Sequence, residues 1–72
     1  MPYRSNADID PRIRRHLPDH AQDIYRAAFN NAWTAHADDP RCEEIAHRIA
    51  WAAVKRRYEK AGDAWVERAP PG

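Results

Sequence analysis

Histidines and carboxylates are paired at helical spacing in two places. His20 and Asp23 lie three residues apart, and Glu43 and His47 lie four apart, so each pair can share one face of a helix. Such a pair could supply two ligands of a metal site, but a structural zinc site needs four ligands and a catalytic one needs three. We therefore predict that these histidines cap helices or form hydrogen bonds, with no bound metal and no cofactor. A metal-sensing module that joins His20, Asp23 and His47 is kept as a third hypothesis.

Other residues that could carry enzymatic chemistry are few. The single cysteine, Cys42, falls in the first turn of a predicted helix, where a cysteine more often packs than reacts. Only two glycines are present, which excludes phosphate-binding loops and dinucleotide fingerprints. The acidic pairs Asp38/Asp39 and Glu43/Glu44 stand at predicted helix starts, where the helix dipole favours carboxylates. We therefore predict that the protein is not an enzyme and takes no small-molecule substrate.

Basic residues gather in two clusters. The first comprises Arg12, Arg14 and Arg15, and the second comprises Arg48, Lys55, Arg56 and Arg57. The net charge of only +1 excludes a protein that coats nucleic acid by field strength alone. If both clusters face the same way, they could contact several phosphates and bind nucleic acid weakly and in a salt-sensitive manner. A solvated surface whose cations complement a helix dipole is the simpler interpretation.

The chain that must position these residues is short and rich in alanine. Its 72 residues are enough for one domain, and few of the 43% that are hydrophobic are large aliphatic residues. Aromatic side chains must therefore provide most of the core. Those expected to be buried are Tyr25, Phe29, Trp33, Trp51, Tyr58 and Trp65. A single cysteine cannot form an internal disulfide, and no stretch resembles a membrane span, so we expect a soluble cytoplasmic protein.

Two helices are predicted in the first half of the chain. Asp10 and Pro11 form an N-cap and first-turn signal, which predicts a short helix over residues 10–16 that Pro18 ends. Apolar residues then recur at spacings of three and four over residues 19–36. This pattern predicts a long amphipathic helix.

A third helix is predicted from Asp39 and Pro40, which repeat the N-cap device, to about Ala61, with Gly62 as its C′ residue. Its apolar residues form two stripes. The first is Cys42, Ala46, Ile49 and Ala53, and the second is Trp51, Val54, Tyr58 and Ala61. A helix that is apolar over so much of its circumference packs on more than one side.

The chain ends are the segments left to cover the second stripe. Tyr3 and Trp65 have strand propensity, and we predict that residues 2–5 and 65–68 pair as a small ribbon over the third helix. Residues 1–68 are expected to form one domain, and residues 69–72 a disordered tail. The predicted fold is mostly α with a minimal β element. It has two long antiparallel helices, a short N-terminal helix and a two-stranded ribbon pairing the N- and C-terminal segments.

Four motifs in the chain are more specific than its periodicity. They are Met-Pro-Tyr-Arg at 1–4, Leu-Pro-Asp-His-Ala-Gln-Asp-Ile-Tyr at 17–25, Ala-Phe-Asn-Asn-Ala-Trp at 28–33 and Glu-Glu-Ile-Ala-His-Arg-Ile-Ala-Trp-Ala-Ala-Val-Lys at 43–55. In this order they resemble the ChaB family, whose members are named putative cation transport regulators. The resemblance implies helices with a small sheet and no enzymatic activity. It also implies a regulatory link, through protein contacts, to a sodium or calcium/proton antiporter.

Polar residues that match these motifs are the candidates for a partner-binding surface. They are His20, Gln22, Asp23, Asn30, His47 and Lys55. If they recognise a partner, His47→Ala should weaken binding at little cost in stability. In the structural interpretation, His20 and Gln22 satisfy backbone groups at the start of the second helix. Asn30 and His47 then form hydrogen bonds between the long helices. Some ChaB-family members are credited with DNA binding, which keeps the arginine clusters as an alternative nucleic-acid surface.

Overall fold

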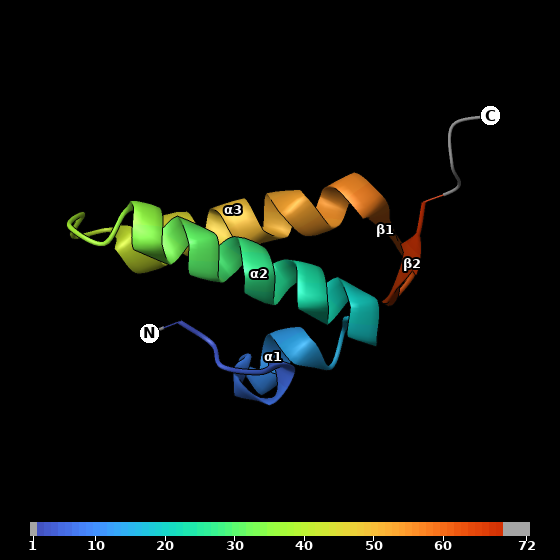
Figure 1. Ribbon diagram of the computed structural model, residues 1–72. Helices are drawn as coiled ribbons and strands as arrows, with labels where there is room; N and C mark the ends of the chain where they lie inside the picture. The colour runs from blue at the N-terminus through green and yellow to red at the C-terminus, as the bar shows by residue number, and fades with distance from the viewer. Residues whose placement is uncertain (1, 69–72) are drawn as a thin grey trace.

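Two antiparallel helices, α2 (Asp19–Ala35) and α3 (Cys42–Arg57), form the body of the protein in a computed structural model that describes residues 2–68 (Figure 1). A 3-10 turn, η1 (Asn6–Asp8), and a short helix, α1 (Pro11–Arg14), precede them. A hairpin of β1 (Tyr58–Ala61) and β2 (Ala64–Glu67) follows. The prediction of a mostly helical fold with a minimal β element is confirmed. The predicted disordered tail, residues 69–72, lies outside the described residues.

The start of α1 follows from its local sequence. Asp10 is the N-cap residue, and its side chain accepts a hydrogen bond of 2.9 Å from the backbone N–H of Arg12. Pro11 occupies the first helical position, where a missing N–H costs nothing. The helix ends at Arg14, earlier than predicted, and Leu17 then turns into the core.

Helix α2 provides the largest side chains of the core. It runs as predicted, ending one residue earlier, at Ala35. Tyr25 and Phe29 are 0% and 1% exposed, respectively. The expectation of an aromatic core is confirmed in part, because Tyr58 is also buried whereas all three tryptophans are only half-buried.

The helix α3 differs from its prediction at both its start and its buried face. It begins at Cys42 with Arg41 at the N-cap, while the Asp39 carboxylate accepts a 2.7 Å bond from the Arg41 N–H. Its buried residues are Cys42, Ala46, Ala50 and Val54. Ile49 is 39% exposed, so its predicted place in a buried stripe is wrong. The rings from α2 fill the space beside α3, and small residues allow this close approach.

The predicted ribbon between the chain ends is wrong. Helix α3 stops at Arg57 rather than at Ala61, and β1 pairs with β2 in antiparallel register from Tyr58↔Glu67 to Ala61↔Ala64. Gly62 has a φ of 62° and is the first of two loop residues, where tight hairpins of this kind place glycine. Positive φ suits a helix C′ position and a hairpin loop equally, so the glycine alone does not distinguish them.

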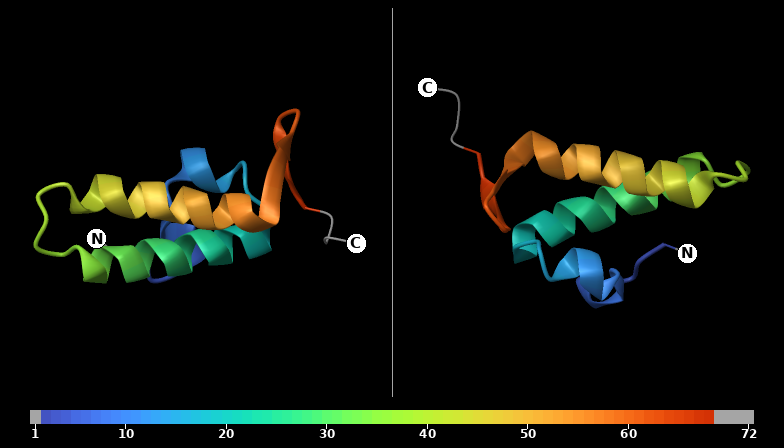
Figure 2. Two further views of the ribbon diagram at one scale, coloured as in Figure 1. Left: turned by 90° about the horizontal axis from the view of Figure 1, so that it is seen from above. Right: turned by 180° about the vertical axis from the view of Figure 1, so that it is seen from behind.

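The hairpin contacts α3 through Trp65, as expected of the C-terminal segment, whereas Tyr58 and Ala61 of the predicted second stripe lie in β1 itself. The ring centroids of Trp65 and Trp51 lie 5.6 Å apart. Figure 2 shows the hairpin standing at the end of α3, away from the N-terminal segment.

The N-terminal segment packs on α2 instead of pairing with the hairpin. The Tyr3 ring stacks on Phe29 with centroids 4.5 Å apart. The Asn30 side chain accepts a 2.8 Å bond from the Tyr3 backbone N–H and donates one of 2.8 Å to its carbonyl. The Asn30 amide therefore gives Tyr3 the two backbone hydrogen bonds that a neighbouring strand would have supplied.

Candidate functional site

Two of the six polar candidates, Gln22 and Asn30, form hydrogen bonds to the backbone of other segments of the fold. Gln22 is 9% exposed, and its side-chain amide donates to the carbonyls of Leu17 at 2.8 Å and Arg14 at 3.3 Å. These acceptors are carbonyls at and just after the end of α1, whereas the sequence interpretation placed the Gln22 bonds at the start of α2. Asn30 bonds to Tyr3 and not to α3, which corrects the expected bond between the long helices.

His47 forms the hydrogen bond between the long helices that the structural interpretation expects. Its Nδ1 is bonded to the hydroxyl of Tyr25, and its ring lies 4.8 Å from that of Phe29 between centroids. Burial raises the pKa of the Tyr25 hydroxyl, and the neighbouring Tyr3 and Asp10 add to the rise. The Tyr25 hydroxyl is therefore kept neutral, in the form that can donate to an imidazole nitrogen.

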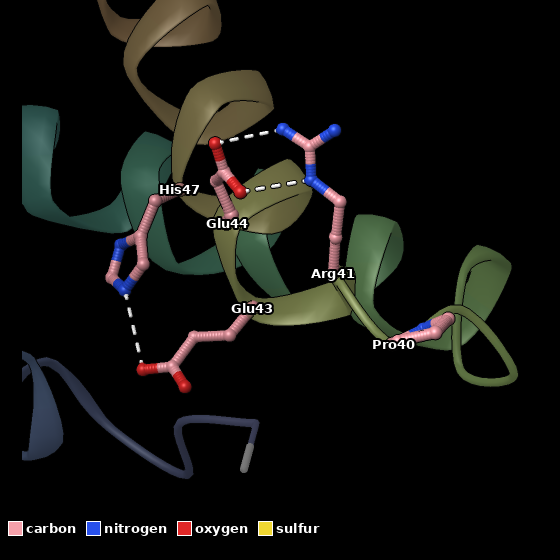
Figure 3. A pocket seen from close by; sticks show the side chains of 5 residues that line it. All are labelled: Pro40, Arg41, Glu43, Glu44 and His47. Carbon is pink, nitrogen blue, oxygen red and sulfur yellow. Dashed lines mark hydrogen bonds and ion pairs between the residues drawn. The ribbon is translucent and has the colours of Figure 1, made fainter.

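A shallow depression of about 420 Å³ lies beside the exposed edge of His47. It is lined by Pro40, Arg41, Glu43, Glu44 and His47 (Figure 3). The Arg41 guanidinium makes two 3.0 Å bonds to the Glu44 carboxylate, and it lowers the pKa of that carboxyl. His47 Nε2 is 3.8 Å from Glu43 Oε1. The charged groups of the depression thus already face partners within the chain.

His20 and Asp23 lie on exposed turns of α2 and contact other elements. His20 Nδ1 is 3.2 Å from the hydroxyl of Tyr58, so it joins α2 to the hairpin. The Asp23 carboxylate accepts a 2.7 Å bond from the Asn6 side chain and lies 3.8 Å from the Arg26 guanidinium. Over residues 2–68, no three His, Cys, Asp or Glu side chains gather as a group that could hold a metal ion. The three members of the metal-sensing hypothesis are therefore not brought together.

The two basic clusters differ in the partners that their side chains have within the chain. On α1, Arg12 forms an ion pair of 3.3 Å with Asp10, and Arg14 donates to the carbonyl of Ala7 at 3.2 Å. Arg15 Nε lies 3.4 Å from the ring of His16. On α3, no ion pair within the described part of the chain involves Lys55, Arg56 or Arg57, the three cations of its last turn.

The clusters also lie apart in the fold. In Figure 1, α2 runs between α1 and the C-terminal end of α3. The condition for one joint phosphate-binding surface, that both clusters face the same way, finds no support in this placement. Arg68, which the sequence reasoning did not single out, adds to the second cluster. It donates 2.8 Å and 2.7 Å bonds to the carbonyls of Lys55 and Arg57 and lies 3.5 Å from Glu59.

One more surface was missed at the sequence level, and we call it the outer face of α3. Each member has another member three or four residues away along the chain, so together they share one side of the helix. They are Ile45, Arg48, Ile49, Ala52, Lys55 and Arg56. Ile45 is half-buried, and the other members are exposed. The i, i+4 spacing of the two isoleucines was the available signal, but Ile49 was assigned to a buried stripe and Ile45 to neither stripe.

Comparison with known proteins gives a consistent result along nearly the whole chain. The family model described as ChaB matches residues 11–68. A relative from Escherichia coli (strain K12), named "Putative cation transport regulator ChaB", is 46% identical over 69 residues, which cover 88% of this chain and 91% of the relative. A protein of the same name from Shigella flexneri matches equally well.

A solved structure is similar in fold as well. It is described as "NMR solution structure of the putative cation transport regulator ChaB", with a TM-score of 0.83 and 44% identity. The match covers 94% of this chain and 100% of that one. Separately, no helix within residues 2–68 has the length and apolarity needed to cross a membrane.

Proposed function

The chain belongs to the ChaB family, and on that premise we propose that it is a non-enzymatic regulator of cation transport. In this proposal the protein acts in the cytoplasm, through contacts with a protein partner. The partner is a cation/proton antiporter or a regulator of one. The observation that carries the proposal is the likeness, over 88% of the chain, to relatives that are named putative cation transport regulators.

The geometry supports a contact surface better than a catalytic site. The side-chain amides of Gln22 and Asn30 are hydrogen-bonded to backbone groups, and His47 is hydrogen-bonded to Tyr25. Lys55 and its two neighbours in the last turn of α3 carry charges that no ion pair of the described residues neutralises. Such cations are available to an anionic surface of a partner at little desolvation cost.

Of the six candidate partner-binding residues, we propose that the exposed ones make the contact. His20, Asp23 and Lys55 are exposed, and His47 keeps an accessible ring edge with 32% of its side chain exposed. His47→Ala should reduce stability because it removes the bond to Tyr25. A loss of partner binding in that variant is therefore interpretable only beside Lys55→Ala, which leaves the core intact.

The regulatory role can be tested on cation exchange. The protein is added to everted membrane vesicles from its source organism, and sodium- or calcium-driven proton exchange is followed with a pH-sensitive dye. We expect the wild-type protein to change the exchange rate or its pH dependence, and heat-denatured protein to have no effect. An exchange rate that stays the same at saturating protein, for both cations, would contradict the proposal.

Nucleic-acid binding is the alternative function. It is favoured by the three cations of the last turn of α3, which take part in no ion pair among residues 2–68. Phosphate contacts would give affinity that falls steeply with salt. The test is fluorescence anisotropy of labelled single- and double-stranded DNA at low and physiological salt. Arg56→Glu with Arg57→Glu should abolish binding, while Arg12→Glu with Arg15→Glu serves as the matched double reversal on α1. No binding at low salt would remove this alternative.

A further inference from the structure

We propose that the outer face of α3 is a docking surface for an acidic, amphipathic helix of a protein partner. This inference rests on the proposed regulatory function and deepens it by adding a second contact surface, which shares Lys55 with the candidates proposed above, and by naming the chemistry of the partner. It depends on three observations, which are the apolar centre of the surface, its charge and its length.

The apolar centre is the isoleucine pair. Ile49 is 39% exposed, and among the described residues only it and Val66, at 41%, are large hydrophobic side chains in the exposed class. Ile45 stands one turn before Ile49 and is half-buried, and the exposed Ala52 extends the apolar strip toward the C-terminus. The N-terminal segment contacts Phe29 of α2, and Trp65 of the hairpin contacts Trp51 of α3, so neither of these contacts covers the isoleucines.

The charge of this surface is of one sign. No Asp or Glu occurs from residue 45 to residue 58, a stretch that contains Arg48, Lys55, Arg56 and Arg57. Arg48 lies 3.4 Å from Glu44, but that carboxylate is already bonded to Arg41. The border of the isoleucine strip therefore has an excess of positive charge, which an acidic partner would complement.

The length of the surface suits a helix. From residue 45 to residue 56 the strip extends through about three turns, or roughly 17 Å at 1.5 Å per residue. A partner helix that places an apolar stripe on the isoleucines brings its flanking positions next to Arg48, Lys55 and Arg56. Acidic residues at those positions meet cations at the rim, while the apolar centre excludes water.

Two other occupants fit the surface less well. A second copy of the chain would present the same cations, because the nearest acid, Glu44, is bonded to Arg41 and Arg48. Like charges would then meet across a symmetric contact. A nucleic-acid backbone would satisfy the cations, but it would set phosphates against Ile49, where no hydrogen bond is offered.

The probe is a labelled synthetic helix of about 18 residues, or five turns, with leucine along one face and glutamate beside it. Two control peptides have the same composition with scrambled leucine positions, or lysine in place of glutamate. Binding to the full chain is measured by fluorescence anisotropy and by amide chemical shifts. We expect the acidic amphipathic peptide alone to bind, with the largest shifts between Ile45 and Arg56.

Ile49→Asp should weaken the affinity for this peptide by about tenfold or more. The matched control is Val66→Asp, because Val66 is equally exposed but lies on the hairpin. The affinity of Val66→Asp for the peptide should stay within about twofold of wild type. Equal binding by both variants, or equal binding of the scrambled peptide, would overturn the proposal. Self-association of the protein that depends on Ile49 and occurs without the peptide would also overturn it. So would duplex DNA that displaces the peptide and binds wild type and Ile49→Asp with equal affinity.

The exchange assay separates this inference from the proposed function. If wild-type protein and Ile49→Asp alter exchange equally, the regulatory role stands and the docking surface is wrong. If the peptide binds in an Ile49-dependent manner but wild-type protein leaves exchange unchanged, the docking surface stands and the regulatory role is wrong.

Discussion

In the middle of α3, the buried face carries smaller side chains than the outer face. Its buried face carries Ala46 and Ala50, each 0% exposed, whereas its outer face displays Ile49 at 39%. Large rings from α2 occupy the space beside the middle of α3, and the facing residues there, Ala46 and Ala50, are small. Hydrophobicity alone therefore does not identify the buried side of a helix whose partner supplies the bulky groups. In α3 this contact leaves Ile49 on the outer side of the helix, one turn after the half-buried Ile45.

The strongest way to test this difference is to place the same charge on each face. Val54→Asp puts a carboxylate at a position that is 0% exposed. Burying it should cost more than the roughly 3–5 kcal/mol that a core of this size provides, so the variant should be unfolded. Ile49→Asp should keep the wild-type fold. Far-UV circular dichroism distinguishes them, and two equally folded variants would show that the faces do not differ.

Alkaline pH tests the packing of Tyr25, on α2, against α3 without a mutation. The pKa of Tyr25 is raised above its ordinary value of 10.0 in the folded protein. The stability that the neutral Tyr25 hydroxyl contributes is therefore fully present below pH 10 and is lost as the pH rises further. About one unit above pH 10, the free energy of unfolding in urea should be lower by about 1.4 kcal/mol. Tyr25→Phe should show a smaller decrease. The same decrease in both proteins would mean that another group titrates.

Removing the Tyr25 hydroxyl should have a moderate effect at neutral pH. Tyr25→Phe deletes the hydrogen bond to His47 while keeping the ring, which should cost about 1 kcal/mol. Thermal unfolding followed by circular dichroism should then show a Tm lower by about 4–8 °C. Tyr3→Phe is the control, since the bonds of Tyr3 to Asn30 use its backbone. A larger loss in Tyr3→Phe than in Tyr25→Phe would contradict this assignment.

The smallest effect is expected at the border of the outer face. Glu44→Gln removes an exposed partner of Arg41 and Arg48, which should leave the Tm close to that of wild type because solvent screens the lost ion pairs. Because it adds positive charge to that border, it should not weaken binding of the acidic peptide. In wild type, an NMR titration should find the pKa of Glu44 below its ordinary value. A weaker peptide affinity in Glu44→Gln would show that the border charge does not attract the peptide.

Much of the helical framework could be predicted because its signals are local. Asp10 and Pro11 mark the start of α1, and apolar spacing over residues 19–36 marks α2. The candidate site could be predicted less well. In the structure, Gln22 and Asn30 form hydrogen bonds within the fold. Only the placement of the elements shows that Ile49 is exposed and that Arg68 binds a backbone carbonyl at the end of α3. Residue type and spacing do not say which polar groups remain for a partner.

Capping residues, prolines and apolar spacing were sufficient for the starts of α1 and α2 and for part of the aromatic core, because each of these signals lies within a short stretch of the chain. The family resemblance depends on four motifs, each of which is also local. The end of α3, the pairing of β1 with β2 and the exposure of Ile49 were settled only by tertiary structure. They depend on contacts between distant residues, such as Trp65 with Trp51 and Tyr3 with Asn30. Strand propensity at Tyr3 and Trp65 does not specify a partner, and packing against the helices selects it.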